Sequence, residues 1–115
     1  GVLLVAARAH DGVAYLPGSL PGVVPVALDS GCRRLDVTVE DRDDGPPTCR
    51  ASGYPRPMPE ASSENELSGL SLAVANVTGM LARELRAGER ASATTAIDLL
   101  RRVEAAGNQL DASTR

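Results

Sequence analysis

Aromatic residues are almost absent from this 115-residue chain, which contains no Phe and no Trp and has only Tyr15 and Tyr54. Any core must therefore be built from Val, Leu, Ala, Ile and Met. Aromatic side chains each bury on the order of 150–250 Å², so a core without them is thin. The length fits one domain. We expect this domain to pack against the surface of another polypeptide.

Lysine is absent as well, so all 12 basic residues are Arg, and with 15 acidic residues they leave a net charge of −3. This balance offers no basic surface for phosphates, and no nucleic acid partner is expected. No apolar run approaches the roughly 20 residues of a membrane span, so no membrane partner is expected either. The apolar run 1–7 is too short for a signal peptide and lacks a cationic leader, which favours a buried strand.

Metal ligands are scarce. His10 is the single histidine, and Cys32 and Cys49 belong to no CxxC motif, so neither a metal nor a cofactor is expected. The two cysteines allow one disulfide in a secreted protein or two buried thiols, and the compartment, secreted or cytoplasmic, stays open. The acidic turn 41–45 lacks the ligand spacing of a calcium loop and is interpreted as a solvated loop.

The strand patterns indicate an α/β chain. Residues 2–7 form a continuous apolar run typical of a central parallel strand that is buried on both faces. Residues 23–28 predict a second apolar strand, which Pro25 should weaken, so that the strand lies at an edge or is irregular. Residues 35–40 alternate with period two, which favours a half-exposed strand.

From Pro46 to Ser68 the chain has a loop-like composition, with a short strand allowed only at 48–50. Apolar residues at helical spacing then predict one helix that Gly88 ends. Its expected apolar face comprises Leu70, Val74, Val77, Leu81 and Leu85.

A second helix is predicted after a cap at Ser92 or Thr94, and Gly107 should close it before a frayed tail. Its expected face comprises Ile97, Leu100, Val103 and Glu104.

Three blocks together resemble the subtilisin-like serine protease family. The first, Gly-Val-Leu-Leu-Val-Ala-Ala-Arg-Ala-His-Asp-Gly at 1–12, is similar to that family's Gly-Val-hydrophobic-Val-Ala-Ala-Ala-Gly-Asn-acidic-Gly strand and loop. Residues 15–27 are similar to its Tyr-Pro-Ala-x-Tyr-Pro-x-Val-Ile-x-Val-Gly-Ala segment. Residues 68–79 are similar to the Gly-Thr-Ser-Met-Ala-x-Pro-His-Val-Ala-Gly block around the catalytic serine. The blocks follow the family's order and approximate spacing.

The resemblance implies an α/β fold, namely the C-terminal portion of a subtilisin-like doubly wound parallel-sheet domain that lacks the N-terminal strands. Residues 1–115 would then form a single partial domain. Its expected parts are strands and loops at 1–50, a loop at 51–68, the nucleophile helix at 69–87, a second helix at 92–107 and a tail at 108–115.

Carried over by position, the resemblance puts Ser71 at the nucleophile, where a helix start would stabilise an oxyanion. The alternative is that Ser71 is a helix cap. His10 stands where the family has the asparagine that donates to the oxyanion, and Ala75 and Asn76 replace its Pro-His. One wall of the substrate pocket would be formed by Ala6, Ala7, Arg8 and Ala9. Arg8 there would either favour an acidic or polar peptide residue or point to solvent.

In the family, the Asp and His of the triad lie upstream of the first matched strand, and the single histidine here, His10, matches the oxyanion position. We therefore expect a serine endopeptidase fragment or subunit that hydrolyses a peptide substrate only when another segment or chain supplies Asp and His. The alternatives are a non-catalytic pseudoprotease that binds peptides or proteins, and an unrelated small α/β domain. The expected protein partner, an N-terminal half or a second copy, would complete the sheet.

Overall fold

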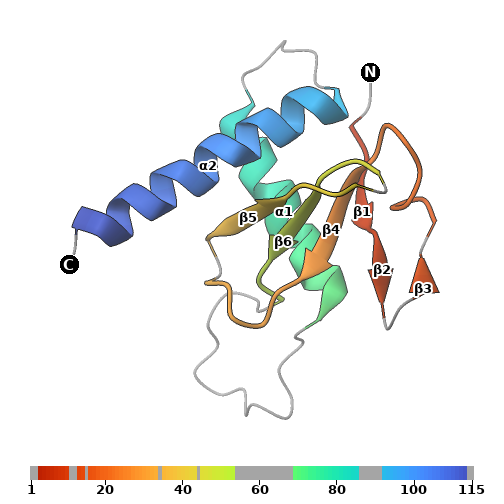
Figure 1. Ribbon diagram of the computed structural model, residues 1–115, viewed down its shortest axis with the longest axis horizontal. Helices are drawn as coiled ribbons and strands as arrows, with labels where there is room; N and C mark the ends of the chain where they lie inside the picture. The colour runs from red at the N-terminus through yellow and green to blue at the C-terminus, as the bar shows by residue number, and fades with distance from the viewer. Residues whose placement is uncertain are drawn as a thin grey trace.

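The computed structural model describes residues 3–10, 13–14, 16–33, 35–43, 45–53, 69–85 and 92–113, apart from the side chains of His10 and of residues 109–113. The strands are β1 (Val5–Ala7), β2 (Ala9–His10), β3 (Val13–Ala14), β4 (Val24–Leu28), β5 (Val37–Glu40) and β6 (Thr48–Ala51). The helices are α1 (Leu70–Glu84) and α2 (Ala93–Ser113). A mixed four-stranded sheet has the order β1-β4-β6-β5, and both helices share one hydrophobic core with it (Figure 1). The predicted α/β class is confirmed.

Strand β4 lies between β1 and β6, so the prediction that Pro25 confines this strand to an edge is wrong. The N–H of Val24 donates to Leu4 O over 2.8 Å, which turns Val24 toward β1 and, by alternation, Pro25 toward β6. Pairing with β6 begins only at Val26, opposite Cys49. The missing N–H of Pro25 therefore falls just outside the paired range and interrupts no hydrogen bond in it.

Strand β1 was expected at the centre of a sheet, but in the described structure it stands at the edge and pairs in parallel with β4 alone. Leu4 is 51% exposed and Val5 is only partly buried, so the strand is not buried on both faces. The reason is that no other described strand pairs with its outer side. A short antiparallel ribbon, β2 with β3, follows β1.

Strands β5 and β6 confirm the alternating and short-strand predictions. Val37 and Val39 are buried at 3% and 8% exposure while Thr38 between them is exposed. Strand β5 pairs antiparallel with β6, and β6 pairs in parallel with β4. Most of the predicted loop between Pro46 and Ser68, from residue 54 onward, lies outside the described residues.

Helix α1 ends at Glu84 with Leu85 as its C-cap, which is shorter than the predicted 69–87, and Gly88 lies outside the described residues. The buried side chains of α1 are those of Ala73, Val77, Met80 and Leu81. The predicted face is therefore confirmed by the buried Val77 and Leu81, and Val74 and Leu85 are partly buried and pack against the same core. Because α1 packs against α2 as well as the sheet, its buried side is broader than one apolar stripe.

Helix α2 begins where the sequence predicted, since Thr95 N–H donates to Ser92 Oγ over 3.2 Å and makes Ser92 the cap. The predicted end at Gly107 is wrong, because the helix continues through it to Ser113. A Cβ at Gly107 would lie 3.3 Å from Asp36 Oδ1. The glycine therefore accommodates a close approach to the loop before β5 instead of ending the helix.

Candidate functional site

The parallel strands β1, β4 and β6 end at one edge of the sheet, and α1 begins beside that edge (Figure 1). The N–H of Gly69 donates to Gly53 O over 3.0 Å, which holds the helix start against the segment that follows β6. Ligands of open α/β sheets bind at such carboxyl edges, because the loops that leave the strands converge there. This edge is the candidate functional site.

Glycine is needed on both sides of that contact. A Cβ at Gly53 would lie 2.4 Å from Leu28 Cδ1 and 2.8 Å from Gly69 O. Gly69 has a φ of 150°, which L side chains rarely adopt. A side chain at position 53 would therefore clash with Leu28 and with the start of α1, and a side chain at position 69 would strain the backbone there. The sequence analysis did not single out this pair, whose members are separated by the undescribed residues 54–68.

Ser71 is the second residue of α1, and it is exposed. The N-cap is Gly69, without a side-chain hydrogen bond, so Ser71 is not the cap of this helix. Its hydroxyl makes no hydrogen bond within the part of the chain that the structure describes. The first turn of a helix carries N–H groups without helical partners and a positive partial charge, so negative charge beside Ser71 would be stabilised.

Asn76, which the resemblance would align with a histidine of the subtilisin-like pattern, holds α1 on the sheet. Its Nδ2 donates to Ser52 O over 2.8 Å, and Ser52 is fully buried. Asn76 lies one turn and a half beyond Ser71 on the same helix. This hydrogen bond helps to position the start of α1 against the end of β6.

The predicted pocket wall and oxyanion position lie at the carboxyl end of β1. Ala6 and Ala7 belong to β1, while Ala9 and His10 form β2, where His10 pairs with Val13. The side chain of His10 lies outside the described part of the structure.

Arg8 joins these two strands. Its Nη1 donates to Pro46 O over 3.3 Å, so the guanidinium contacts the β5–β6 connection, which crosses toward β1 in Figure 1. In this structure the Arg8 side chain is thus engaged within the chain.

Ser71 and His10 share the sheet edge, but they follow different strands. Ser71 lies beside the end of β6 and His10 follows β1, with β4 between them. Strands are spaced about 4.8 Å apart, so roughly 10 Å of sheet width separates the two strand ends.

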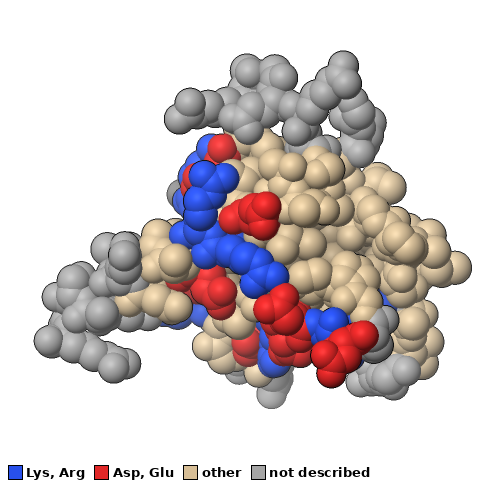
Figure 2. Space-filling view, turned by 45° about the horizontal axis from the view of Figure 1, so that its top comes forward, with Lys and Arg blue, Asp and Glu red and all other residues tan. Residues whose placement is uncertain are grey.

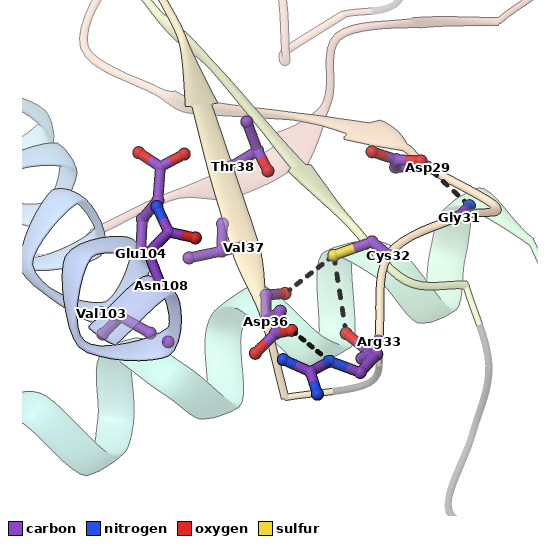
Figure 3. Close-up of a pocket in the computed structure, with 11 residues that line it drawn as sticks. Asp29, Gly31, Cys32, Arg33, Asp36, Val37, Thr38, Val103, Glu104 and Asn108 are labelled. Carbon is purple, nitrogen blue, oxygen red and sulfur yellow. Dashed lines mark hydrogen bonds and ion pairs between the residues drawn. The ribbon is translucent and has the colours of Figure 1, made fainter. Parts of the chain in front are cut away.

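A second group of polar side chains, which the sequence analysis missed, lines a pocket of about 260 Å³ between the β4–β5 connection and α2 (Figure 3). It includes the carboxylates of Asp29, Asp36 and Glu104. Asp36 Oδ2 accepts a hydrogen bond from Arg33 Nε over 2.8 Å, and Asp29 Oδ2 lies 3.7 Å from Arg50 Nε. The lining comes from two segments, 29–38 and 103–108, which are far apart in the sequence, so no local spacing could have indicated that they meet. The carboxylates of this pocket can accept hydrogen bonds from the donor groups of a small polar molecule.

The cysteine at this pocket is not poised for nucleophilic chemistry. Cys32 Sγ lies 3.2 Å from Asp36 O and 3.5 Å from Arg33 O (Figure 3). Burial, together with the carboxylates of Asp29 and Asp36, raises the pKa of Cys32. Burial also raises the pKa of Cys49 to about 12. Both are free thiols, and both stay protonated at neutral pH.

Within the described ranges, no cluster of three or more His, Cys, Asp or Glu side chains is arranged to hold a metal ion. Neither described helix combines the length and the apolar character that crossing a membrane requires. Comparison with known proteins adds no identity: the chain matches no family model, no curated protein and no solved structure.

Proposed function

We propose that this chain is the nucleophile-bearing part of a subtilisin-like serine endopeptidase, which hydrolyses peptide bonds when another segment or chain supplies the Asp and the His. The observation that carries the proposal is the position of Ser71. It is exposed in the first turn of a helix that starts at the carboxyl edge of parallel strands. A nucleophile there would lie beside the loops that leave the parallel strands and beside the helix N–H groups.

The order of the elements supports the same proposal. Strand β1, its return to the parallel neighbour β4, and the later helix α1 coincide with the three blocks that resemble the family. The subtilisin-like origin of the chain is part of what is proposed.

The chemistry then requires a base from outside this sequence. Ser71 attacks a peptide carbonyl only if its proton is taken up, and the single histidine of the chain, His10, corresponds to the oxyanion donor. In the completed site the supplied imidazole would accept the Ser71 proton and later return it to the leaving amine. The N–H groups of the α1 first turn and the His10 ring would donate to the oxyanion. Loss of one such donor costs about 10²–10³ in turnover, so a histidine in place of the asparagine predicts slow hydrolysis.

The test uses a fluorophosphonate probe on the intact chain, with imidazole in solution as a substitute base. Without imidazole the chain should remain unlabelled. With imidazole, mass spectrometry should find the label on Ser71, and the Ser71→Ala variant should stay unlabelled. The exposed Ser92, which caps α2, serves as the internal control because it lies at a helix start far from the carboxyl edge. Absence of imidazole-dependent labelling at Ser71, or equal labelling of both serines, argues against a nucleophile.

A second candidate function is a non-catalytic module that binds an extended peptide or protein segment. The observation that favours it is Asn76, which stands at a histidine position of the family and holds the helix instead. This candidate predicts that Ser71→Ala leaves partner binding unchanged. Labelling and binding measured on the same variant therefore separate the two functions.

A further inference from the structure

Charge does not select a partner for the described face in Figure 2, because acidic and basic side chains adjoin there in one band. Ion pairs within the described chain show the same balance. Arg101 Nη2 lies 2.7 Å from Asp41 Oδ1. Arg50 Nη1 lies 3.0 Å from Glu40 Oε2. These charges are therefore satisfied within the chain.

An uncharged motif in α1 has no part in the proposed chemistry of Ser71. Residues 76–78 are Asn-Val-Thr, which has the Asn-x-Thr form of an acceptor for N-linked glycans. In the transfer, Asn76 Nδ2 forms a bond to the anomeric carbon of a lipid-linked oligosaccharide diphosphate. The bond from that carbon to the diphosphate oxygen breaks, the lipid diphosphate leaves, and one amide proton passes to a base of the transferase. Acceptors of such bulky groups lie in surface loops, whereas this motif lies in the middle of a helix.

The helix separates the two polar groups of the motif. Successive residues of a helix are turned by about 100° around its axis, so Asn76 and Thr78 project about 200° apart. Asn76 Nδ2 turns toward the sheet and donates to Ser52 O over 2.8 Å. Thr78 is exposed, and its Oγ1 donates to Val74 O over 2.8 Å within the helix. A transferase that binds the amide and the hydroxyl in one site therefore cannot engage both while this segment is helical.

The core opposes local unwinding of the motif. Val77, between the two polar residues, is 0% exposed, and so is Ala73 one turn earlier. Ser52 is also fully buried, so its carbonyl would lose a hydrogen bond if Asn76 turned outward. Presenting residues 76–78 as an extended segment thus requires α1 to leave β6 and the core.

We propose that Asn76 accepts an N-linked oligosaccharide only while α1 is undocked from β6, and that the folded chain excludes this modification. A glycan on Asn76 therefore marks chains in which the start of α1, with Ser71, is not held at the sheet edge. The transfer does not involve the Ser71 hydroxyl, so the modification is independent of the proposed function.

The experiment incubates the full folded chain, free of glycan, with a purified oligosaccharyltransferase and a lipid-linked oligosaccharide diphosphate. The peptide acetyl-Ala-Asn-Val-Thr-Gly-amide, which repeats residues 75–79, gives the rate for an unstructured acceptor. Mass spectrometry should find the peptide modified and the chain modified at least about 100-fold more slowly, because a packed helix opens rarely. The ratio of the two rates should equal the fraction of open α1, which hydrogen exchange at the Val77 amide measures.

Two alanines of α1 provide matched variants that leave residues 76–78 unchanged. Ala73→Asp places a charge at a position that is 0% exposed, so α1 should undock and Asn76 should be modified at nearly the rate of the peptide. Ala82→Asp makes the same change at an exposed position of the same helix, and it should keep the low rate of the parent chain.

Three results would overturn the inference. An unmodified peptide would show that the Asn-Val-Thr sequence is not an acceptor. A parent chain modified faster than its open fraction allows would show that the docked helix accepts the glycan. Equal rates in the Ala73→Asp and Ala82→Asp variants would show that docking of α1 does not control the modification.

Discussion

The side-chain amide of Asn76 donates a hydrogen bond to the backbone carbonyl of Ser52 over 2.8 Å, and this bond joins the middle of α1 to the end of β6. Ser52 is fully buried, so its carbonyl has no access to bulk water in place of the amide. The bond lies between the helix start at Gly69 and the buried side chains farther along α1. It therefore determines how Ser71 is presented at the sheet edge.

Replacing Asn76 by Ala should lower the free energy of unfolding by about 1–3 kcal/mol, because the buried Ser52 carbonyl loses its hydrogen bond from the Asn76 amide. Urea unfolding measures the change. Thr78→Ala is the control, since Thr78 Oγ1 bonds Val74 O on the exposed side of the same helix, and the effect there should stay within about 0.5 kcal/mol. Equal losses in the two variants would show that the bond to Ser52 is not the stabilising contact.

Replacing each of two glycines by Ala should change the stability of the fold in opposite directions. Gly18→Ala should destabilise the fold by about 1–3 kcal/mol, because the new Cβ would meet Ala7 O at 1.7 Å. Gly79→Ala should stabilise it by about 0.5–1 kcal/mol, because nothing lies within 4 Å of a Cβ at that position in α1. Thermal unfolding of both variants provides the comparison. A Gly18→Ala variant as stable as the parent would mean that the contact with Ala7 is absent in solution.

Ser92→Ala should lower the free energy of unfolding by about 1 kcal/mol, because Thr95 N–H loses its capping acceptor. Helix α2 should also fray more at its start, which amide hydrogen exchange at Thr95 would detect. Thr94 is the neighbouring exposed alternative, and Thr94→Ala should be nearly neutral. The reverse ranking of the two variants would identify Thr94 as the functional cap.

The buried thiol of Cys49 should make stability depend on alkaline pH. Its pKa is raised from 9.0 to about 12 by burial, so the folded chain keeps a proton that the unfolded chain loses in that range. The contribution of the protonated Cys49 thiol to the free energy of unfolding is fully present below pH 9 and disappears as pH rises toward about 12. Unfolding of the parent and of Cys49→Ala over this range should show a steeper decline in the parent. Parallel declines would mean that Cys49 does not titrate differently in the two states.

Local patterns in the sequence determined several elements, because they depend on neighbours along the chain. Alternation placed Val37 and Val39 on the buried side of β5, and the side chain of Ser92 determined where α2 begins. For the candidate site, the sequence placed Ser71 in the first turn of a helix, and the structure agrees. Its role as a nucleophile stays a prediction.

The tertiary structure alone decided the features that depend on partners distant in sequence. Pro25 is compatible with an inner strand because pairing with β6 starts only at Val26, and Gly107 lies inside α2 because the helix passes close to Asp36. Neither the register of strand pairing nor the close approach of a helix to a loop produces a periodic pattern in the sequence. The contact of Gly53 with Gly69, which sets the start of α1, likewise arises only when β6 and the helix meet. Propensity and periodicity act over a few residues, whereas these contacts depend on how the elements pack.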